Sequence, residues 1–250
     1  MQYLLSHASL SILKRLASER TLFAFDFDGT LSPIVDHPDE AGMREVTRDL
    51  LSRLAKFHPV VIVSGRARAD LLSKLRGVKL ARVIGNHGAE TGPVTQNWRR
   101  HIHKWKSIIE HEVGSFLGVW VEDKGLSLAV HYRLSSEKAK VRRRVFALAG
   151  KLKQARVFGG KQVINVVVDV APHKGEALAA ERDRLNCQWV LFVGDDENDE
   201  AAFAMDGKII PVRIGRKRVS HARYYLRSQA EIDKLLERLV ENAGKIASVT

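Results

Sequence analysis

Acidic, hydroxyl and amino side chains follow several short apolar runs of the chain. Asp26 and Asp28 come directly after residues 22–25, Ser64 after residues 60–63, and Asp195-Asp196 after residues 190–194. In open α/β sheets, ligands bind outside the carboxyl ends of the strands. We therefore expect these groups to share one site. Carboxylates that lie so close need a cation, and Mg²⁺ takes oxygen ligands of this kind.

A phosphoryl group suits this set of side chains. A carboxylate can attack phosphorus, a lysine and a hydroxyl can hold the phosphate oxygens, and a second carboxylate can move the proton. Asp26 and Asp28 are two residues apart, which puts them on the same side of an extended segment. Gly29 frees the backbone to turn after them. Lys174 begins a predicted helix, where backbone N–H groups also favour an anion.

Two regions of alternating strands and helices must position these residues. Apolar runs predict strands at 22–25, 60–63, 82–84, 190–193 and 208–214. Amphipathic segments between them predict helices, among them 175–186 and 197–205. Ser228 and Glu231 predict a capping box for the last helix. The alternation is typical of a parallel sheet with helical crossovers, which places the chain in the α/β class.

Between these regions the pattern changes. We expect helices at 98–117 and 136–152, a strand at 125–133, and a hairpin that turns at Gly159-Gly160. This order is typical of a small α+β module with an antiparallel sheet. The predicted domains are therefore a core of residues 1–92 and 170–250 and an insert of residues 93–169, joined by linkers near 90–97 and 168–173.

Composition limits the classes of function. The chain has 250 residues, 45% of them apolar, and a formal net charge of +12. Its basic residues are dispersed and lack interleaved aromatic side chains, so we expect no nucleic-acid partner. No apolar run reaches the ~18 residues of a membrane span, and the first 20 residues do not resemble a signal peptide. The single Cys187 favours a reducing, cytoplasmic location.

Four motifs in order resemble the haloacid dehalogenase (HAD) superfamily of phosphatases: FDFDGTLSP, VIVSGR, the lysine of HKGEAL, and GDDENDE. The resemblance implies a Rossmann-like core with an inserted α+β cap. It implies that Asp26 is the nucleophile and Asp28 the general acid/base. It implies that the phosphate is bound by Gly29, Ser64, Gly65 and Lys174. It implies that Mg²⁺ is bound by Asp26, the backbone carbonyl of Asp28, and Asp195, with Asp196 or Asp199 in support.

A closer resemblance, over nearly the whole chain, is to the trehalose-phosphate phosphatase family. It extends from DGTLSPIVDHPDEAGM through VIVSGR, GNHGAE and EDKGLSLAVHYR to GDDENDEAAF. That family recognises its sugar with residues of the cap and of the HGxE loop. The resemblance therefore implies substrate contacts from His87, Glu90, Glu122 and Lys124, with His131 and Arg133 as weaker candidates. We add Arg66, which either reaches an anion or covers the first turn of a helix.

Two positions depart from the family's pattern. A glutamate and, two residues on, an arginine are usual on the second hairpin strand, where this chain has Asn165 and Val167. Asn165 can still hydrogen-bond a sugar hydroxyl. We therefore expect a Mg²⁺-dependent phosphatase that acts on a sugar phosphate, foremost trehalose 6-phosphate. Alternatives are another glycoside phosphate, such as a glucosylglycerate-type phosphate, a hexose phosphate, or a basic nucleic-acid-binding protein. Asp199 either contacts the metal or favours the positive end of a helix.

Overall fold

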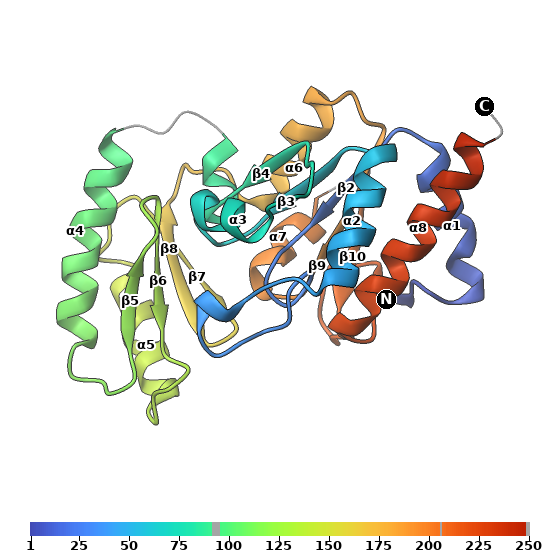
Figure 1. Ribbon diagram of the computed structural model, residues 1–250. Coiled ribbons are helices and arrows are strands. Elements are labelled where there is room, and N and C mark those ends of the chain that lie inside the picture. Colours follow the sequence, from blue (N-terminus) through green and yellow to red (C-terminus); the bar gives the residue numbers. More distant parts are fainter. Residues whose placement is uncertain (92–95, 206, 249–250) are drawn as a thin grey trace. The chain divides into compact units, whose positions relative to one another are not determined.

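The computed structural model describes residues 1–91, 96–205 and 207–248 (Figure 1). Within them the chain forms two compact units. The core unit comprises Met1–Gly88, His173–Asp195 and Asp199–Thr250, and the cap unit comprises Ala89–Pro172 and Asp196–Asn198. The expected boundary between residues 92 and 93, and half of the expected linker 90–97, lie outside the described residues.

The core unit is built on a parallel sheet. In the described residues this sheet has seven strands in the order β1-β11-β10-β9-β2-β3-β4. The strands are β1 (Gln2–Tyr3), β2 (Thr21–Phe25), β3 (Val60–Val63), β4 (Arg82–Ile84), β9 (Trp189–Gly194), β10 (Ile209–Ile214) and β11 (Tyr224–Leu226). The α/β class is confirmed. The short strands β1, at the edge of the sheet, and β11, beside it, were not predicted, because two or three residues carry too little periodicity.

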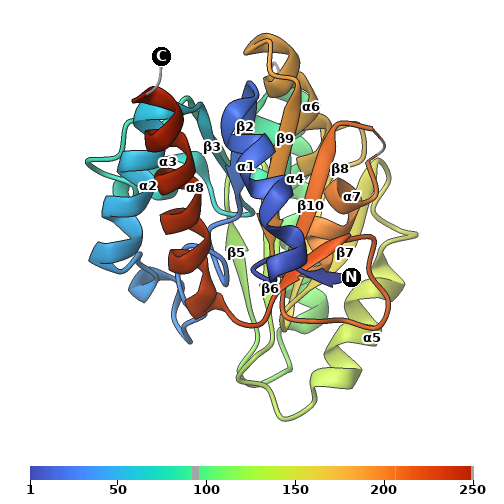
Figure 2. The ribbon, with the colours of Figure 1, turned by 90° about the vertical axis from the view of Figure 1, so that its right-hand side faces the viewer.

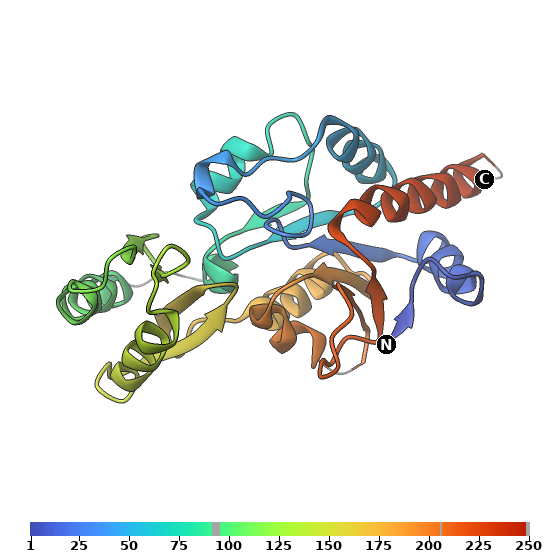
Figure 3. The same cartoon turned by 90° about the horizontal axis from the view of Figure 1, so that it is seen from below.

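Helices cover both faces of this sheet. Alternate residues of each strand point to opposite faces, so Phe23 and Phe25 pack with one layer of helices and Leu22 and Ala24 with the other. The first layer contains α1 (Leu10–Ser18), α2 (Glu45–Phe57), α3 (Arg68–Lys74) and α8 (Ile232–Ala247); the second contains α6 (Lys174–Arg184) and α7 (Glu200–Phe203). Figure 3 shows α6 and α7 on the opposite side of the sheet from α2 and α3. Burial on both faces explains why these strands are almost uniformly apolar.

The cap unit has an antiparallel sheet in the order β5-β6-β8-β7. Its elements are α4 (Gln96–Val113), β5 (Trp120–Asp123), β6 (Ser127–His131), α5 (Lys138–Leu148), β7 (Ala155–Gly160) and β8 (Val163–Val168). Both helices pack on one face of the sheet, against Leu128, Val130, Ile164 and Val166. The opposite face carries the alternate residues, among them Glu122 and Asn165.

The helices of the cap unit expose their charges. Arg142, Arg143 and Arg144 all lie on the solvent side of α5, and Arg144 forms an ion pair with Glu112 of α4. The basic residues of α5 therefore form a solvated helix face. Among the described residues, no helix combines the length and the apolar character that crossing a membrane requires.

Two local predictions were wrong, and a third had the wrong bounds. The strand predicted at 125–133 is present but shorter, as β6 (Ser127–His131), because Gly125 has a φ of +79° and turns the chain between β5 and β6. The second hairpin turns at Lys161-Gln162, two residues after Gly159-Gly160, and Gln162 there has a φ of +62°. Glu231 forms no capping box with Ser228, since its carboxylate accepts hydrogen bonds from the Tyr3 hydroxyl and the Arg227 N–H instead.

The C-terminal helix α8 packs in the first layer of helices. Figure 2 shows it beside α2 and near α1. Leu236 of this helix is completely buried, whereas Ile246 is 39% exposed. Replacing Leu236 by Ala should lower the free energy of unfolding by about 2–5 kcal/mol, the cost of an unfilled core position. Ile246→Ala, the control on the same helix, should cost less than about 1 kcal/mol. Urea denaturation measures both, and equal losses would contradict this packing.

Candidate active site

The carboxyl ends of three neighbouring strands bring the predicted residues together. Phe25 of β2 pairs with Ile62 of β3 and with Val193 of β9. Asp26, Ser64 and Asp195, which follow these strands, therefore emerge at one edge of the sheet. This is the edge at which α/β proteins bind ligands.

Asp26, Asp195 and Asp199 form a buried acidic cluster. One carboxylate oxygen from each lies within 4.8 Å of the other two, and all three residues are at most 4% exposed. Lys174 is the cation among them: its Nζ lies 2.9 Å from Oδ2 of Asp26 and donates to Oδ1 of Asp199 at 2.7 Å. The second oxygen of Asp199 accepts the backbone N–H of Asp195 at 2.9 Å. Asp199 therefore both pairs with the lysine and organises the loop after β9.

Burial dominates the electrostatics of this cluster. Burial raises the pKa of the Asp26 carboxyl well above its ordinary value, and the charges of Asp199 and Asp195 raise it further, although Lys174 opposes them. For Lys174, burial alone would lower the pKa, but Asp199 and Asp26 outweigh it and leave the pKa raised. Lys174 therefore stays charged. One ammonium among three carboxylates leaves an excess of buried negative charge, which a divalent cation would offset.

Glycine provides the space for this cluster. A Cβ at Gly29, which has a φ of +76°, would lie 2.0 Å from Oδ2 of Asp195. The same glycine donates its N–H to the carbonyl of Ser32 at 2.8 Å. Its function in this geometry is thus to let two loops approach, and a direct contact of Gly29 with phosphate stays a prediction. The buried Oγ1 of Thr30, the next residue, has no hydrogen-bond partner in the described part of the chain.

Two residues that sequence reasoning missed fix the loops around the cluster. His173 caps α6: its Nδ1 accepts the N–H of Gly175 at 3.0 Å, and Glu176 accepts the N–H of His173 at 2.9 Å. This capping box holds Lys174 at the first helical position. The spacing of His173 and Glu176 in the sequence could have indicated the capping box. The buried Arg213 of β10 donates to the carbonyl of Asp195 at 2.7 Å and to Glu200. No local sequence signal identifies this arginine.

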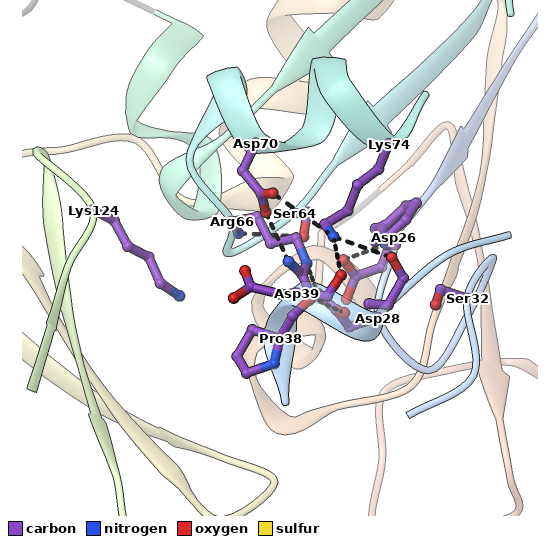
Figure 4. A network of polar contacts seen from close by, with 12 residues as sticks. Asp26, Asp28, Ser32, Pro38, Asp39, Ser64, Arg66, Asp70, Lys74 and Lys124 are labelled. Atoms are coloured by element: carbon purple, nitrogen blue, oxygen red, sulfur yellow. Dashed lines mark hydrogen bonds and ion pairs between the residues drawn. The ribbon is translucent and has the colours of Figure 1, made fainter. Parts of the chain in front are cut away.

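Asp28 lies outside the acidic cluster, with its side chain 40% exposed. Both of its oxygens accept hydrogen bonds from Arg66, from Nε at 2.7 Å and from Nη2 at 2.8 Å (Figure 4). Arg66 itself is only 8% exposed. The two carboxylates of the DxD motif therefore occupy different environments, since Asp26 is buried beside a lysine and Asp28 is half-exposed beside an arginine.

Ser64 and the HGxE loop lie at the adjacent strand ends. Ser64 is buried, its carbonyl accepts the N–H of His87 at 2.9 Å, and its Oγ accepts the N–H of Arg66 at 3.3 Å. A Cβ on Gly65 would lie 2.3 Å from the His87 ring, so only glycine permits this contact. The backbone of His87 has a φ of +60°, which holds the buried imidazole against Gly65. His87 therefore packs next to the phosphate-binding candidates Ser64 and Gly65.

The sugar-binding candidates of the cap unit share one row across its sheet. Glu122 pairs with Ala129, and Ala129 pairs with Asn165, which puts Glu122 and Asn165 on the same face. Oε2 of Glu122 lies 2.7 Å from Nε2 of His131 and 3.7 Å from Nζ of Lys124. The His131 ring is stacked on Trp120, with 4.7 Å between centroids. This face therefore gathers polar and aromatic groups, the usual means of binding a sugar.

Asp196 and Glu90 are less closely connected to these groups. Oδ2 of Asp196 accepts hydrogen bonds from the N–H of Lys161 and from the side-chain amide of Asn198. Among the described residues, Asp196 is not part of the acidic cluster that could hold a metal ion. Glu90 belongs to the 3₁₀ segment Asn86–Thr91. Metal contact by Asp196 and substrate contact by Glu90 stay predictions.

A scan against protein-family models matches residues 24–226 to the trehalose-phosphatase family. The chain belongs to this family. The match includes every core motif and the whole cap unit, so the resemblance read from the sequence is confirmed. The buried acidic cluster of this family member has the donor set for a divalent metal ion.

Curated relatives agree with this assignment. The chain is 29% identical to a probable trehalose-phosphate phosphatase D of Arabidopsis thaliana, over 86% of this chain and 66% of that protein. It is 30% identical to a trehalose-phosphate phosphatase of Mycobacterium leprae, over 92% of this chain and 60% of that protein. The chain thus spans 66% and 60% of the length of these two relatives.

Solved structures show the same fold. The C-terminal domain of the trehalose-6-phosphate phosphatase of C. albicans matches with a TM-score of 0.78 and 21% identity, over 93% of this chain and 96% of that one. A HAD-superfamily phosphatase of Bacteroides thetaiotaomicron matches with a TM-score of 0.61 and 18% identity, over 88% and 95%. The predicted parallel-sheet core with an inserted α+β cap is therefore confirmed.

Metal binding can be tested by the stability of the protein. After treatment with a chelator, Mg²⁺ at about 100 times its Kd should raise the Tm by roughly 5–10 °C. The raised pKa of Asp26 means that protons compete with the metal, so this shift should shrink as the pH falls through that pKa. Without metal, the protonated Asp26 favours the folded state at low pH, and this stabilisation is lost as the pH rises through the same pKa.

Differential scanning fluorimetry over a series of pH values measures the shift. Asp195→Asn should abolish it, whereas Asp183→Asn should leave it unchanged, because Asp183 is a surface residue whose side chain is 68% exposed. A shift of the same size in the Asp195 variant would place the metal elsewhere.

Proposed function

We propose that this chain hydrolyses trehalose 6-phosphate to trehalose and phosphate, as a phosphoric monoester hydrolase. The observation that carries the proposal is the buried cluster of Asp26, Asp195 and Asp199 around Lys174, at the ligand-binding edge of a sheet in a trehalose-phosphatase family member. The proposed identity of the sugar rests on the curated relatives, which are named trehalose-phosphate phosphatases. The chemistry of the core and the identity of the sugar can therefore be tested separately.

In the proposed reaction, an oxygen of Asp26 attacks phosphorus and the bond from phosphorus to the sugar oxygen breaks. Asp28 gives its proton to that oxygen as it leaves, which produces free trehalose and an aspartyl-phosphate on Asp26. Water then attacks phosphorus and gives a proton to Asp28, and the acyl-phosphate P–O bond breaks. Inorganic phosphate leaves, and both carboxyl groups return to their starting states.

Lys174 and Ser64 hold the phosphate oxygens during both steps. The positive charge of Lys174 is secured by its two carboxylate neighbours. Mg²⁺ would be held by Asp26, the carbonyl of Asp28, Asp195 and Asp199, and when bound it offsets the repulsion between the anionic nucleophile and the anionic substrate. The nearly complete burial of Asp26 keeps its carboxylate from being stabilised by water before it reacts.

The cap unit is the proposed source of sugar recognition. Glu122 and Asn165 share one face of its sheet, Nζ of Lys124 lies 3.7 Å from Oε2 of Glu122, and His87 and Glu90 belong to the HGxE loop. Asn165 offers an amide where the family usually has a glutamate. Another glycoside phosphate or a hexose phosphate is therefore the second candidate substrate. The proposal includes a cytoplasmic location, which the free, buried Cys187 favours.

Asp26→Asn tests the nucleophile. The substitution keeps the size of the side chain and removes its charge, so kcat should fall by at least about 1,000-fold, as for other catalytic nucleophiles. Phosphate release from trehalose 6-phosphate measures this, and Asp36→Asn on a nearby loop is the control. Turnover within tenfold of the natural protein would refute the mechanism.

A panel of sugar phosphates tests the substrate. We expect the highest kcat/KM for trehalose 6-phosphate, compared with glucosylglycerate-type and hexose phosphates. Asn165→Ala removes one hydrogen-bonding side chain, so it should raise KM about tenfold for the preferred sugar. It should leave the hydrolysis of p-nitrophenyl phosphate, which has no sugar, unchanged, and Asn97→Ala on the surface of α4 is the control. If trehalose 6-phosphate ranks below the hexose phosphates, the sugar assignment fails while the phosphatase activity stands.

A further inference from the structure

Arg66 commits nearly all of its hydrogen-bonding capacity to the protein itself. Its Nε and Nη2 donate to the two oxygens of Asp28, its Nη1 donates to Oδ2 of Asp70 at 2.7 Å, and Nη2 donates again to the carbonyl of Pro38 at 2.8 Å. A guanidinium has about five N–H donors, so these contacts use four of them. The arginine side chain is 9% exposed. About one of its N–H donors is therefore left to bind a substrate anion.

The contacts reach Arg66 from different parts of the core unit. Asp70 lies in the first turn of α3, Pro38 belongs to the loop that precedes α2, and the Arg66 Cζ lies 5.6 Å above the centre of the Phe27 ring. Phe27 stands between the two aspartates of the DxD motif. The guanidinium is therefore fixed in its plane by hydrogen bonds and across its face by an aromatic ring.

Lys74 reinforces the same arrangement. Its Nζ lies 3.9 Å from Oδ1 of Asp70 and donates to the carbonyls of Asp39 and Ala41, each at 3.1 Å. Asp70 is therefore held between two cations, and the loop of residues 38–41 is tied to α3. Figure 4 shows Arg66 between Asp28 and Asp70, with Lys74 nearby.

We propose that Arg66 is the positioning residue for the general acid/base Asp28, and that Asp70 is the carboxylate that orients Arg66. This proposal rests on the proposed function. A bidentate fork fixes both the place and the plane of a carboxylate, which a single ammonium cannot do. Asp28 is otherwise half-exposed on a loop that follows a strand. Without the fork, its carboxyl would reach the leaving oxygen in only a fraction of its conformations.

Arg66→Lys is the first test. Lysine keeps the positive charge and loses the fork, so kcat should fall about 100-fold, the cost of misplacing a catalytic group by about 1 Å. KM should change less than about threefold, because the substrate is not touched. An arginine that bound the substrate would give the opposite result, a large rise in KM. The control is Arg48→Lys. Arg48 donates to the backbone carbonyls of Lys74 and Arg76, at the end of α3, and its hydrogen bonds within the described residues go to no carboxylate.

Asp70→Asn is the second test and serves if Arg66→Lys does not fold. It keeps the shape and one acceptor, and kcat should fall about tenfold, as is common when an outer-sphere partner is changed. KM and the Tm should stay near those of the natural protein. An unchanged kcat in both variants would overturn the proposal.

A double-mutant cycle decides whether Arg66 acts through Asp28. In an Asp28→Ala background, Arg66→Lys should cost less than about twofold in kcat, because the group that it positions is gone. If the double variant instead loses the product of the two separate fold-losses in kcat, the proposal is overturned. The cycle is run with the best hydrolysed sugar phosphate of the panel, whichever sugar that is, because a sugar oxygen needs a proton to leave. If the natural protein hydrolyses no phosphomonoester at all, the proposed function fails, and the positioning role fails with it.

Discussion

The structure of the active site depends on the burial of three carboxylates beside a single ammonium. Asp26, Asp195 and Asp199 are almost inaccessible to solvent, and Lys174 pairs with two of them. Removing charge from water is costly unless it is paired, so the surrounding elements must bring these groups together within a few ångströms. The parallel sheet aligns the strand ends, the capping box of His173 sets the lysine, and Gly29 lets the two acidic loops approach. The excess negative charge makes a divalent cation the natural complement of this site.

A second charged network lies beside the first and has a different character. Its side chains alternate in charge in the order Asp28, Arg66, Asp70 and Lys74. Both of its carboxylates are more than a third exposed. The two aspartates of one motif thus divide their work by environment. The buried Asp26, the proposed nucleophile, is shielded from water, whereas Asp28, the proposed general acid/base, is partly exposed and held by an arginine. Two residues of separation in an extended segment are enough to create this difference.

The alternation of its strands separates the packing face of the cap unit from the face proposed to recognise the sugar. One face of the sheet is apolar and is covered by α4 and α5, and the other carries Glu122, Lys124, His131 and Asn165. Specificity can therefore change on the second face without disturbing the core of the unit. Asn165 is an example, since an amide replaces the family's usual glutamate while its neighbours Ile164 and Val166 still point into the apolar core.

The sequence by itself determined the features that depend on neighbouring residues. Apolar runs located β2, β3, β4, β9 and β10, and the strand-end positions of Asp26, Ser64 and Asp195 indicated a shared site. Local patterns failed where geometry depends on backbone conformation, as at Gly125 and Gln162, whose positive φ values set the two turns. Only the tertiary structure decided which distant charges pair. Lys174 meets Asp26 and Asp199, Arg66 meets Asp28, and Arg213 meets Glu200. The physical reason is that burial makes each unpaired charge costly, and the available partners are set by the packing of the whole core rather than by spacing along the chain.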